Sequence, residues 1–398
     1  MANNNENKIL NVPHLRFPEF SGEWVTKSIN DLAVVIGGGT PDTTVKSYWD
    51  GEIQWFTPSE IGKNKYVDSS LRTITEVGLN NSSAKLLPPN TILLSSRATI
   101  GECSLSLREC ATNQGFQCLV SKKCNVDFLY YLIQTKKKDL IRKSCGSTFL
   151  EISANEVRKI QVSVPSDVEQ QKIAELLSLI DERIATQNKI IEKLQSLIKG
   201  LSQQLLSSEN DWILYRLDDL AQIKSGYSGT QVSYQTPYKV SRIETISKHC
   251  IDIQRIGYVE CIPESYRLNV GNILFSNINS IQYIGNTAYL DKDYGLYHGM
   301  NLLRIIPNTT IVRPRFLHLL LCTDWAINYF QTICNKAVSQ ASINQTALGK
   351  SRFPIPPMSV QQQICSMFEL TERKLDNEQE YISCLQQQKR YLLQKMFI

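Results

Sequence analysis

Very few residues of this chain have the types and spacing that catalysis requires. Glu372 and Lys374 are spaced like the Glu-x-Lys pair of a nuclease, but they fall inside a long helical pattern with no Pro-Asp pair nearby upstream. The Asn-Pro-Pro-aromatic run of amino-methyl transfer does not occur, and serine, histidine and aspartate occur without a nucleophile elbow. We therefore expect no active site in this chain.

Signals for phosphate and metal binding are equally weak. The triplet Gly37–Gly39 could cradle a phosphate, yet no lysine follows it as in a P-loop and no G-x-G-x-x-G is present. It predicts either a plain tight turn or a flexible turn beside a ligand surface. The eleven cysteines include no C-x-x-C pair and are expected to be reduced thiols. The four histidines lack the spacing of zinc ligands: His14, His249, His298 and His318.

The composition limits the class of protein. A chain of 398 residues, with 42% hydrophobic and 20% charged residues, is long enough for two well-packed domains of a soluble protein. No apolar run approaches the ~18–20 residues of a transmembrane helix, and Met1–Asn7 lacks the layout of a signal peptide. We therefore expect a cytoplasmic protein with no membrane partner. The net charge of +5 permits nucleic-acid binding but does not require it.

The chain contains the same arrangement twice. VSVP at Val162–Pro165 and EQQKI at Glu169–Ile173 return as FPIP at Phe353–Pro356 and VQQQI at Val360–Ile364. Each copy opens a long helical pattern. The separation of about 190 residues exceeds the period of common solenoids, so it indicates a duplicated unit of one domain and one helix. Further matches keep the same order: Trp24–Leu32 with Trp212–Leu220, Ile92–Ser95 with Ile273–Ser276, and Ile100–Gly101 with Ile284–Gly285.

Apolar residues follow a heptad pattern in both helical segments. The first series is interrupted at Gln187 and comprises Ile173, Leu177, Ile180, Ile184, Ile191, Leu194, Ile198, Leu201 and Leu205. The second has the same register with more polar interruptions and comprises Ile364, Phe368, Leu375, Ile382, Leu385, Leu392 and Met396. Glu378 of the second series aligns with Gln187 of the first.

The first helix should span roughly 50–60 Å, which is too long to bury its apolar stripe against one compact domain. We therefore expect the two helices to pair antiparallel, with one globular domain at each end, as in a dumbbell. Two alternatives stay open. Each helix could pack flat on its own domain, or the polar interruptions could leave room for helices of a partner.

The predicted fold class is α+β, with two similar domains joined by two long antiparallel coiled-coil helices. Strand-like runs occur at Ile53–Phe56, Thr91–Leu94 and Ile273–Phe275, and helices are expected over 127–141 and 315–330. The predicted boundaries are a disordered N-terminus at 1–14, a first domain at 15–164, a central helix at 165–208, a second domain at 209–356 and a C-terminal helix at 357–398.

The order of these motifs resembles that of a known family. The first half carries GGTP at Gly38–Pro41, SRATIG at Ser96–Gly101, TNQGF at Thr112–Phe116, GST at Gly146–Thr148 and the EQQKI helix entrance. Together with the duplication, these motifs resemble the specificity (S) subunit of type I restriction–modification enzymes over nearly the whole chain after residue 14. The second half departs at its loops, with Ser225–Tyr227 for the triple glycine and His298–Asn301 near the Asn-Gln-Gly position.

This resemblance implies two target recognition domains, each reading one half of a split, asymmetric site in double-stranded DNA, with the coiled coil setting the spacer. It also implies two methylation (M) subunits docked on the helices and domains, joined by restriction (R) subunits. The chain itself would hold no cofactor and no catalytic residue. S-adenosylmethionine would belong to the methylation partner, which modifies adenine at N6, and ATP and magnesium to the restriction partner.

Given that resemblance, specificity is expected from side chains that reach base edges in the major groove, with Asn or Gln on adenine and Arg or Lys on guanine. The first-domain candidates are Thr40, Arg97, Thr99, Asn113, Gln114 and Thr148. The second-domain candidates are Arg242, Asn277, Asn279, Gln282, Tyr283 and Asn301. Arg97 could instead form a structural ion pair, and Asn113 could simply hold a turn.

Two other functions remain open from the residues alone. A protein-binding scaffold, with two ligand domains on a helical rod and no DNA role, fits the modest charge. Salt-sensitive binding to duplex DNA would separate a DNA reader from such a scaffold. An enzyme with an unfamiliar site would show activity from the purified chain alone.

Overall fold

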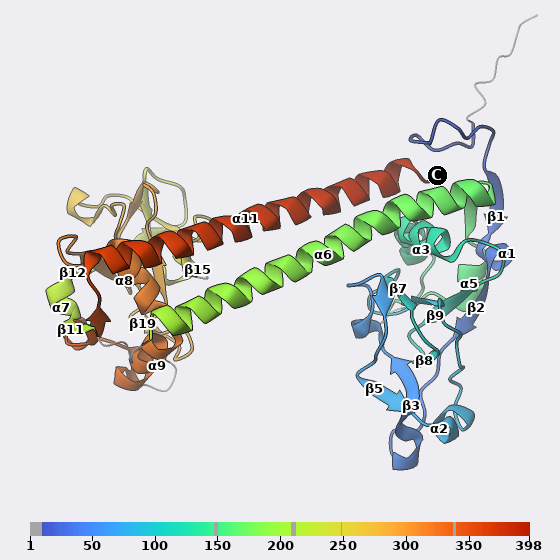
Figure 1. Ribbon diagram of the computed structural model, residues 1–398, viewed down its shortest axis with the longest axis horizontal. Coiled ribbons are helices and arrows are strands. Elements are labelled where there is room, and N and C mark those ends of the chain that lie inside the picture. The colour runs from blue at the N-terminus through green and yellow to red at the C-terminus, as the bar shows by residue number, and fades with distance from the viewer. Residues whose placement is uncertain (1–9, 147–149, 208–211, 248, 337–339) are drawn as a thin grey trace, which may run out of the picture. The chain divides into compact units, whose positions relative to one another are not determined.

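The structure, a computed structural model, describes residues 10–146, 150–207, 212–247, 249–336 and 340–398 (Figure 1). The chain divides into two compact units, 1–190 with 378–398 and 191–377. Each unit contains one α+β domain and a segment of both long helices, α6 (Asp167–Leu205) and α11 (Met358–Lys395). The predicted fold class of two similar α+β domains joined by two long helices is confirmed.

A five-stranded sheet forms the centre of the first domain. Its order is β2-β9-β6-β7-β4, with β4 parallel to β7 and the other pairs antiparallel. The bounds are β2 (Ala33–Gly37), β4 (Tyr66–Val67), β6 (Ile92–Leu94), β7 (Cys103–Ser106) and β9 (Gln117–Ser121). Helix α3 (Val126–Thr135) and the first turns of α6 share one buried apolar cluster with this sheet. Burial of that cluster is the main stabilising term of the domain.

A smaller sheet of the first domain contains the strand predicted at Ile53–Phe56. Its order is β5-β3-β8, with β3 (Trp49–Phe56), β5 (Arg72–Ile74) and β8 (Cys110–Thr112). Trp49 and Trp55 are buried in its core, edge to face, with ring centroids 5.1 Å apart. The remaining elements are β1 (Val25–Ser28), α1 (Ile29–Leu32), α2 (Glu76–Asn80), α4 (Lys137–Arg142), α5 (Ala154–Arg158) and β10 (Gln161–Val164), with short 3₁₀ turns at Lys46–Tyr48 and Pro58–Glu60.

The second domain repeats the central sheet of the first. The strand order β12-β22-β18-β20 corresponds to β2-β9-β6-β7, and the pair β11–β25 corresponds to β1–β10. The bounds are β11 (Ile213–Arg216), β12 (Ala221–Ser225), β18 (Ile273–Phe275), β20 (Thr287–Tyr289), β22 (Leu303–Pro307) and β25 (Arg352–Ile355). The predicted duplication is therefore present in the sheets themselves.

The smaller sheets are where the two domains differ. In place of β5-β3-β8, the second domain has the sheet β13-β17-β14-β21, the pair β15–β16 and the sheet β19-β24-β23. Their bounds are β13 (Gln231–Val232), β14 (Tyr238–Val240), β15 (Ile246–Ser247), β16 (Cys250–Ile251), β17 (Gly257–Val259), β19 (Ile278–Asn279), β21 (Leu296–Tyr297), β23 (Asn335–Lys336) and β24 (Ala341–Ser342). Short helical elements are η3 (Ile243–Thr245), η4 (Glu264–Tyr266), α7 (Leu217–Leu220) and α10 (Gln345–Gly349).

Each helix predicted over 127–141 and 315–330 is in fact two helices. In the first domain α3 is followed by α4, and in the second α8 (Pro314–Leu321) is followed by α9 (Asp324–Ile333). The Thr323 side chain accepts a hydrogen bond from the Ala326 backbone N–H (3.3 Å) and so caps α9. The prediction of single helices was wrong because the apolar stripe continues across this local cap.

The glutamine repeated at both helix entrances fastens each long helix to its domain. Gln170 is buried, donates from Nε2 to the Pro165 carbonyl (3.0 Å) and accepts the Asn125 backbone N–H at Oε1 (3.1 Å). Gln361 forms the same two bonds, to the equivalent proline (2.9 Å) and from the Arg313 backbone N–H (2.7 Å). Because both ends of each buried amide have partners, the motif ties the helix to the start of α3 or α8.

The two long helices contact each other within the first unit (Figure 1). Gln187 of α6 donates to the Glu378 carboxylate of α11, and Lys389 of α11 pairs with Asp181 of α6 (2.7 Å). The order of these contacts makes the helices antiparallel there. They contradict the alternative that each helix packs only on its own domain. The polar interruptions of the two heptad series therefore face each other.

None of the predicted seam residues is exposed. In the first unit Ile173, Leu177, Ile180, Leu385, Leu392 and Met396 are buried, and Ile184 and Ile382 are half-buried. In the second unit Ile364 and Phe368 are buried, and Ile191, Leu194, Ile198, Leu201, Leu205 and Leu375 are half-buried. In the parts of the chain described, no helix is long and apolar enough to cross a membrane.

The N-terminal segment predicted as disordered, 1–14, is described only from residue 10. Asn11 donates to the Trp24 carbonyl (2.6 Å) and accepts from the Ser163 hydroxyl (2.9 Å). Leu15 donates its backbone N–H to the Lys395 carbonyl of α11 (2.8 Å). These bonds hold residues 10–15 against the first domain, and residues 1–9 lie outside the described residues.

Candidate nucleic-acid interface

Three loops of the first domain meet at the glycine triplet. Gly39 donates its N–H to the last residue of β8 (2.8 Å), and Ser96 donates its N–H to the Gly115 carbonyl (2.8 Å). A Cβ on Gly38 would lie 2.0 Å from the Asn113 carbonyl oxygen, so only glycine permits this approach. The triplet is therefore a loop crossing, where the loop after β2 passes against the loop after β8.

The first-domain candidates gather on these loops. Thr40 donates from its hydroxyl to Gln114 Oε1 (2.5 Å), and Gln114 is exposed at the tip of its loop. Thr99 is also exposed, on the loop after β6. Thr148 lies outside the described residues. The structure thus brings three exposed or half-exposed polar side chains to one end of the domain.

Arg97 and Asn113 have structural partners in the same loops. Arg97 Nη2 lies 2.8 Å from Glu151 Oε2, with 42% and 35% of the two side chains exposed. Asn113 accepts the Gly115 N–H at Oδ1 (2.8 Å). These are the ion pair and the turn that the sequence left open. A guanidinium that keeps this much exposure has donors free, so base contact by Arg97 stays a prediction.

The second domain repeats the loop crossing with different residues. A Cβ on Gly226 would lie 1.8 Å from the Gly299 carbonyl oxygen, as at the equivalent glycine of the first domain. Ser225–Tyr227 and His298–Asn301 therefore occupy the places of the glycine triplet and of the TNQG run. The buried Ser241 hydroxyl accepts the Gly299 N–H (3.0 Å) and holds the crossing together.

Arg242 and Asn301 flank this second crossing, and both are exposed. Arg242 Nε lies 3.4 Å from Glu244 in an exposed ion pair, which contributes little to stability. Asn301 adopts a left-handed backbone conformation with φ of 63°, which asparagine tolerates better than most residues. The pair therefore presents a guanidinium and an amide beside the loop crossing.

The other four second-domain candidates lie in the segment 277–283 that follows β18, with Asn279 in the short strand β19. Asn277 donates to the Ile343 carbonyl (3.3 Å), and Asn279 accepts the N–H of the following residue (2.8 Å). Gln282 and Tyr283 are exposed. The two asparagines hold the loop, and the two residues after them present polar groups to solvent.

Sequence reasoning missed four residues of these regions. Glu151 pairs with Arg97, Ser241 holds the second crossing, and Lys224 lies opposite Arg304 on the paired strands β12 and β22. A signal for Arg304 was available, because an arginine within the apolar run Leu302–Ile306 falls on a strand that must be largely buried.

Both halves of the chain match one family model. That model, the type I restriction modification DNA specificity domain, covers residues 21–196 and 209–387. The chain belongs to the type I restriction–modification DNA specificity family. With two such domains, it is a DNA sequence-specificity subunit.

Individual relatives agree with this assignment. The chain is 30% identical over 327 residues to the type I restriction enzyme MjaIX specificity subunit of Methanocaldococcus jannaschii, a match that spans 69% of this chain and 75% of the relative. It is 29% identical over 210 residues to the EcoR124I/EcoR124II specificity subunit of Escherichia coli, spanning 51% and 49%. The S subunit crystal structure from M. genitalium, 16% identical, has the same fold, with a TM-score of 0.60 over 97% of this chain and 99% of that one.

Proposed function

We propose that each domain of this specificity subunit reads one half of a split, asymmetric target in double-stranded DNA. The observation that carries this proposal is the repeated loop crossing, where one framework presents two different sets of polar side chains. Thr40, Thr99 and Gln114 belong to the first crossing, and Arg242 and Asn301 to the second. Two readers of different chemistry suit a target whose halves differ.

The exposed side chains have the chemistry of major-groove recognition. The Gln114 and Asn301 amides offer the donor and acceptor that match adenine, and the Arg242 guanidinium matches the two acceptors of guanine. A good bidentate contact of this kind contributes about 1–3 kcal/mol of discrimination against a wrong base. A few such contacts in each domain suffice for a short half-site.

We assign the paired helices the role of setting the spacer between the half-sites. Helix α6 has 39 residues, which corresponds to about 58 Å at 1.5 Å per residue. The polar pair Gln187–Glu378 supports a fixed register, because a lone polar contact in an apolar seam penalises every other alignment of the helices.

Exposed apolar side chains on the helices support docking of two methylation subunits. Leu179, Ile190 and Leu197 of α6 are exposed and spaced by 11 and 7 residues, close to three and two helical turns, so they share one face. Leu370 and Tyr381 of α11 are likewise exposed and 11 residues apart. Apolar stripes on a helix suit partner helices. Restriction subunits complete the proposed assembly.

The chemistry of that assembly lies in the partners. The methylation subunits use S-adenosylmethionine to modify adenine at N6, after the base has left the duplex. The restriction subunits use ATP and magnesium. The specificity chain contributes DNA selection, and within its described residues no cluster of three His, Cys, Asp or Glu is placed to hold a metal ion.

A methylation map tests the proposal. The chain is co-expressed with its neighbouring methyltransferase subunit in a host that lacks adenine methylation, and the genome is sequenced for N6-methyladenine. The expected result is a split motif with two short halves and a fixed gap, which disappears when the specificity chain is omitted. A stable complex that leaves the DNA unmethylated, or that modifies one contiguous motif, would overturn it.

A further inference from the structure

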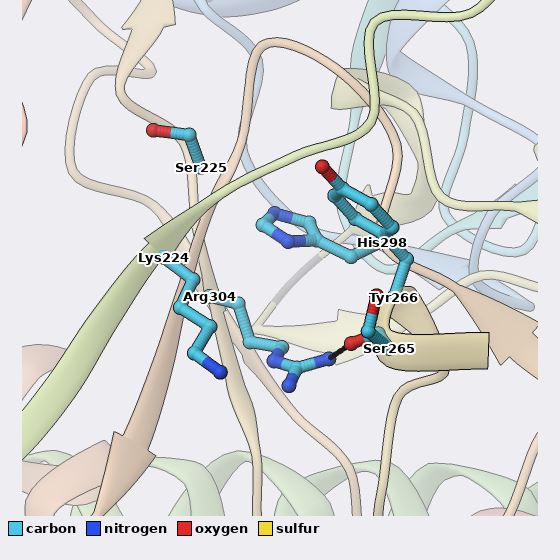
Figure 2. Close-up of a pocket in the computed structure, with 6 residues that line it drawn as sticks. All are labelled: Lys224, Ser225, Ser265, Tyr266, His298 and Arg304. Carbon is cyan, nitrogen blue, oxygen red and sulfur yellow. Dashed lines mark hydrogen bonds between the residues drawn. The ribbon is translucent and has the colours of Figure 1, made fainter. Parts of the chain in front are cut away.

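The second domain contains a pocket beside its loop crossing. It has a volume of about 190 Å³ and is lined by Lys224, Ser225, Ser265, Tyr266, His298 and Arg304 (Figure 2). Lys224 and Ser225 come from β12, Arg304 from β22, Ser265 and Tyr266 from η4, and His298 from the crossing itself. The volume is several times that of a water molecule in the liquid, so a small polyatomic group fits.

Arg304 lies at the floor of this pocket with only part of its guanidinium bonded. The residue is 5% exposed, and its Nη1 donates to the carbonyls of Arg267 (2.8 Å) and Ser265 (3.5 Å). Its Nε–H has no partner, and no carboxylate among the described residues pairs with it. A buried charge without a counter-charge is costly, and burial here lowers the pKa of Arg304.

A second cation lies directly beside the first. Lys224 is opposite Arg304 in the antiparallel pair β12–β22, and it is exposed at the mouth of the pocket. Figure 2 shows the two cationic side chains reaching toward the same end of the pocket. Like charges directly opposite each other destabilise a strand pair, so the arrangement is unfavourable until an anion lies between them.

His298 adds no charge to this pocket near neutral pH. Its Nε2 donates to the Leu302 carbonyl (2.9 Å), and burial lowers the pKa of the imidazole to about 4. The positive charge of the pocket therefore comes from Lys224 and Arg304 alone. Ser225 and Ser265 also line the pocket, and the Ser225 hydroxyl donates to Gln345 Oε1 (3.5 Å).

The first domain shows that the framework does not require these cations. The cross-strand pair equivalent to Lys224–Arg304, the same rung of the sheet, is formed in the first domain by Ile36 of β2 and Cys118 of β9. Cys118 is buried in an apolar cluster, with Ile36 packed against it. The equivalent strand pair of the first domain thus folds with Ile36 and Cys118 at these positions. The cation pair of the second domain is therefore not required for folding of this sheet.

We propose that this pocket binds one phosphate group, and that a phosphodiester of the bound DNA backbone supplies it. The second part rests on the proposed function; the first does not. A phosphate held here would carry no sequence information but would fix the register of the second domain on the duplex. Arg304 and Lys224 are then phosphate-binding residues beside the base-reading loops.

The first arm of the test uses inorganic phosphate as the probe. The melting temperature of the full chain is followed against phosphate at constant ionic strength, with chloride as the balancing anion. Wild type and Lys239→Gln, which removes an exposed cation from β14, should show a saturable rise. Lys224→Gln and Arg304→Gln should not. Lys224 is exposed, so its variant keeps the test valid should the Arg304 variant fail to fold. A rise that survives in both variants would overturn the site.

The second arm identifies the source of the phosphate. Binding of the full chain to duplexes with and without the methylated motif is measured as a function of salt. Lys224→Gln should weaken binding to both duplexes by the same factor, because a backbone phosphate carries no sequence information. The double variant Lys224→Ile/Arg304→Cys, which removes both cations and installs the residues of the first domain, should reduce the slope of log K against log salt by about 1, because one phosphate is involved. An unchanged slope with a lost response to phosphate would assign the pocket to the free anion and overturn the DNA-backbone source. Failure of motif-specific binding would leave the first arm intact, so the two proposals fail separately.

Discussion

At the same rung of the same antiparallel pair, the first domain places Ile36 opposite Cys118 and the second places Lys224 opposite Arg304. The first pair belongs to an apolar cluster, whereas the second lines a polar pocket. Both rungs lie at the end of the pair that leads into the loop crossing. The sheet therefore accepts either chemistry at this position, because its backbone hydrogen bonds and its apolar strands elsewhere determine the fold.

A second pair of equivalent positions shows the opposite distribution of charge. Arg97 bridges to Glu151 in the first domain, and Ile278 pairs with Ser342 in the second. The equivalence is fixed by the next backbone bonds, in which an isoleucine N–H donates to the residue before Arg97 or Ile278 (3.1 and 2.8 Å). The first domain thus neutralises its arginine, and the second keeps an unneutralised one elsewhere. Charges vary around a constant framework, which is the property that two independent readers need.

Exchange of a whole domain should have the largest effect. Replacement of residues 24–160 by the first domain of another family member should change one half of the methylated motif completely and leave the other half and the gap unchanged. The reason is that each domain has its own core and its own loop crossing. Methylation mapping reads the outcome. A change in both halves would show that the two domains do not read independently.

Lengthening the helices should change the gap and neither half. The pairing of Gln187 with Glu378 places the stretch after Ile191 opposite that near Lys374, so one heptad is inserted after each. Each insertion adds about 10 Å of helix, or roughly 3 base pairs at 3.4 Å per pair. The expected motif has the same halves and a longer gap. A heptad in α6 alone is the control, and it should abolish methylation by breaking the register. An unchanged gap in the doubly extended chain would contradict the role of the helices as a spacer.

Mild acid should weaken the second domain and spare the first. His249, His298 and His318 all belong to the second domain, and burial lowers the pKa of each, that of His298 to about 4. Unfolded chains take up these protons near pH 6.5, so stability is complete above that pH and falls as the pH drops from 6.5 toward 4. His298 alone accounts for about 3 kcal/mol over that range, at 1.36 kcal/mol per pKa unit.

Hydrogen exchange at pH 7.5 and 5, corrected for intrinsic rates, measures this difference domain by domain. The expected result is that acid lowers the protection of the second domain only. This loss of protection should be smaller in His298→Gln than in wild type. Equal losses in both domains would contradict the assignment to the buried histidines.

Substitution of the two helix-entrance glutamines should lower stability by a similar amount in both domains. Gln170→Ala and Gln361→Ala each leave a buried N–H and a buried carbonyl without a partner, at a cost of about 1–3 kcal/mol. Gln171→Ala and Gln362→Ala, one residue on and exposed, should stay within about 0.5 kcal/mol of wild type. Denaturant unfolding of the full chain measures all four. A large loss at one site with none at the other would break the equivalence.

Much of the framework could be predicted from the sequence because its signals are local and repeated. The heptads of α6 and α11, and the strands around Leu93 and Leu274, follow from apolar spacing that the duplication shows twice. The split of the helix over 315–330 could not be read from that spacing, although the cap at Thr323 was present in the sequence.

The candidate site was less predictable because its geometry depends on contacts between distant segments. Gln114 meets Thr40 over 74 residues of chain, and Arg97 meets Glu151 across a bridge between two loops. The pocket around Arg304 requires η4, which lies about 40 residues earlier in the chain. Sequence can indicate that such a strand is buried, but not which segment covers an arginine on it.

The smallest effect should come from the Arg97–Glu151 ion pair of the first domain, whose equivalent positions in the second domain, Ile278 and Ser342, carry no charge. Exposed pairs such as Arg97–Glu151 contribute about 0.2–1 kcal/mol, so Arg97→Gln and Glu151→Gln should each lower stability slightly and equally. Their effects on DNA should differ. If Arg97 reads guanine, Arg97→Gln relaxes one position of the first half-site, while Glu151→Gln leaves the motif unchanged. Methylation mapping of both variants decides the point. If both variants give the wild-type motif, Arg97 has only the structural role that its partner in the loop suggests.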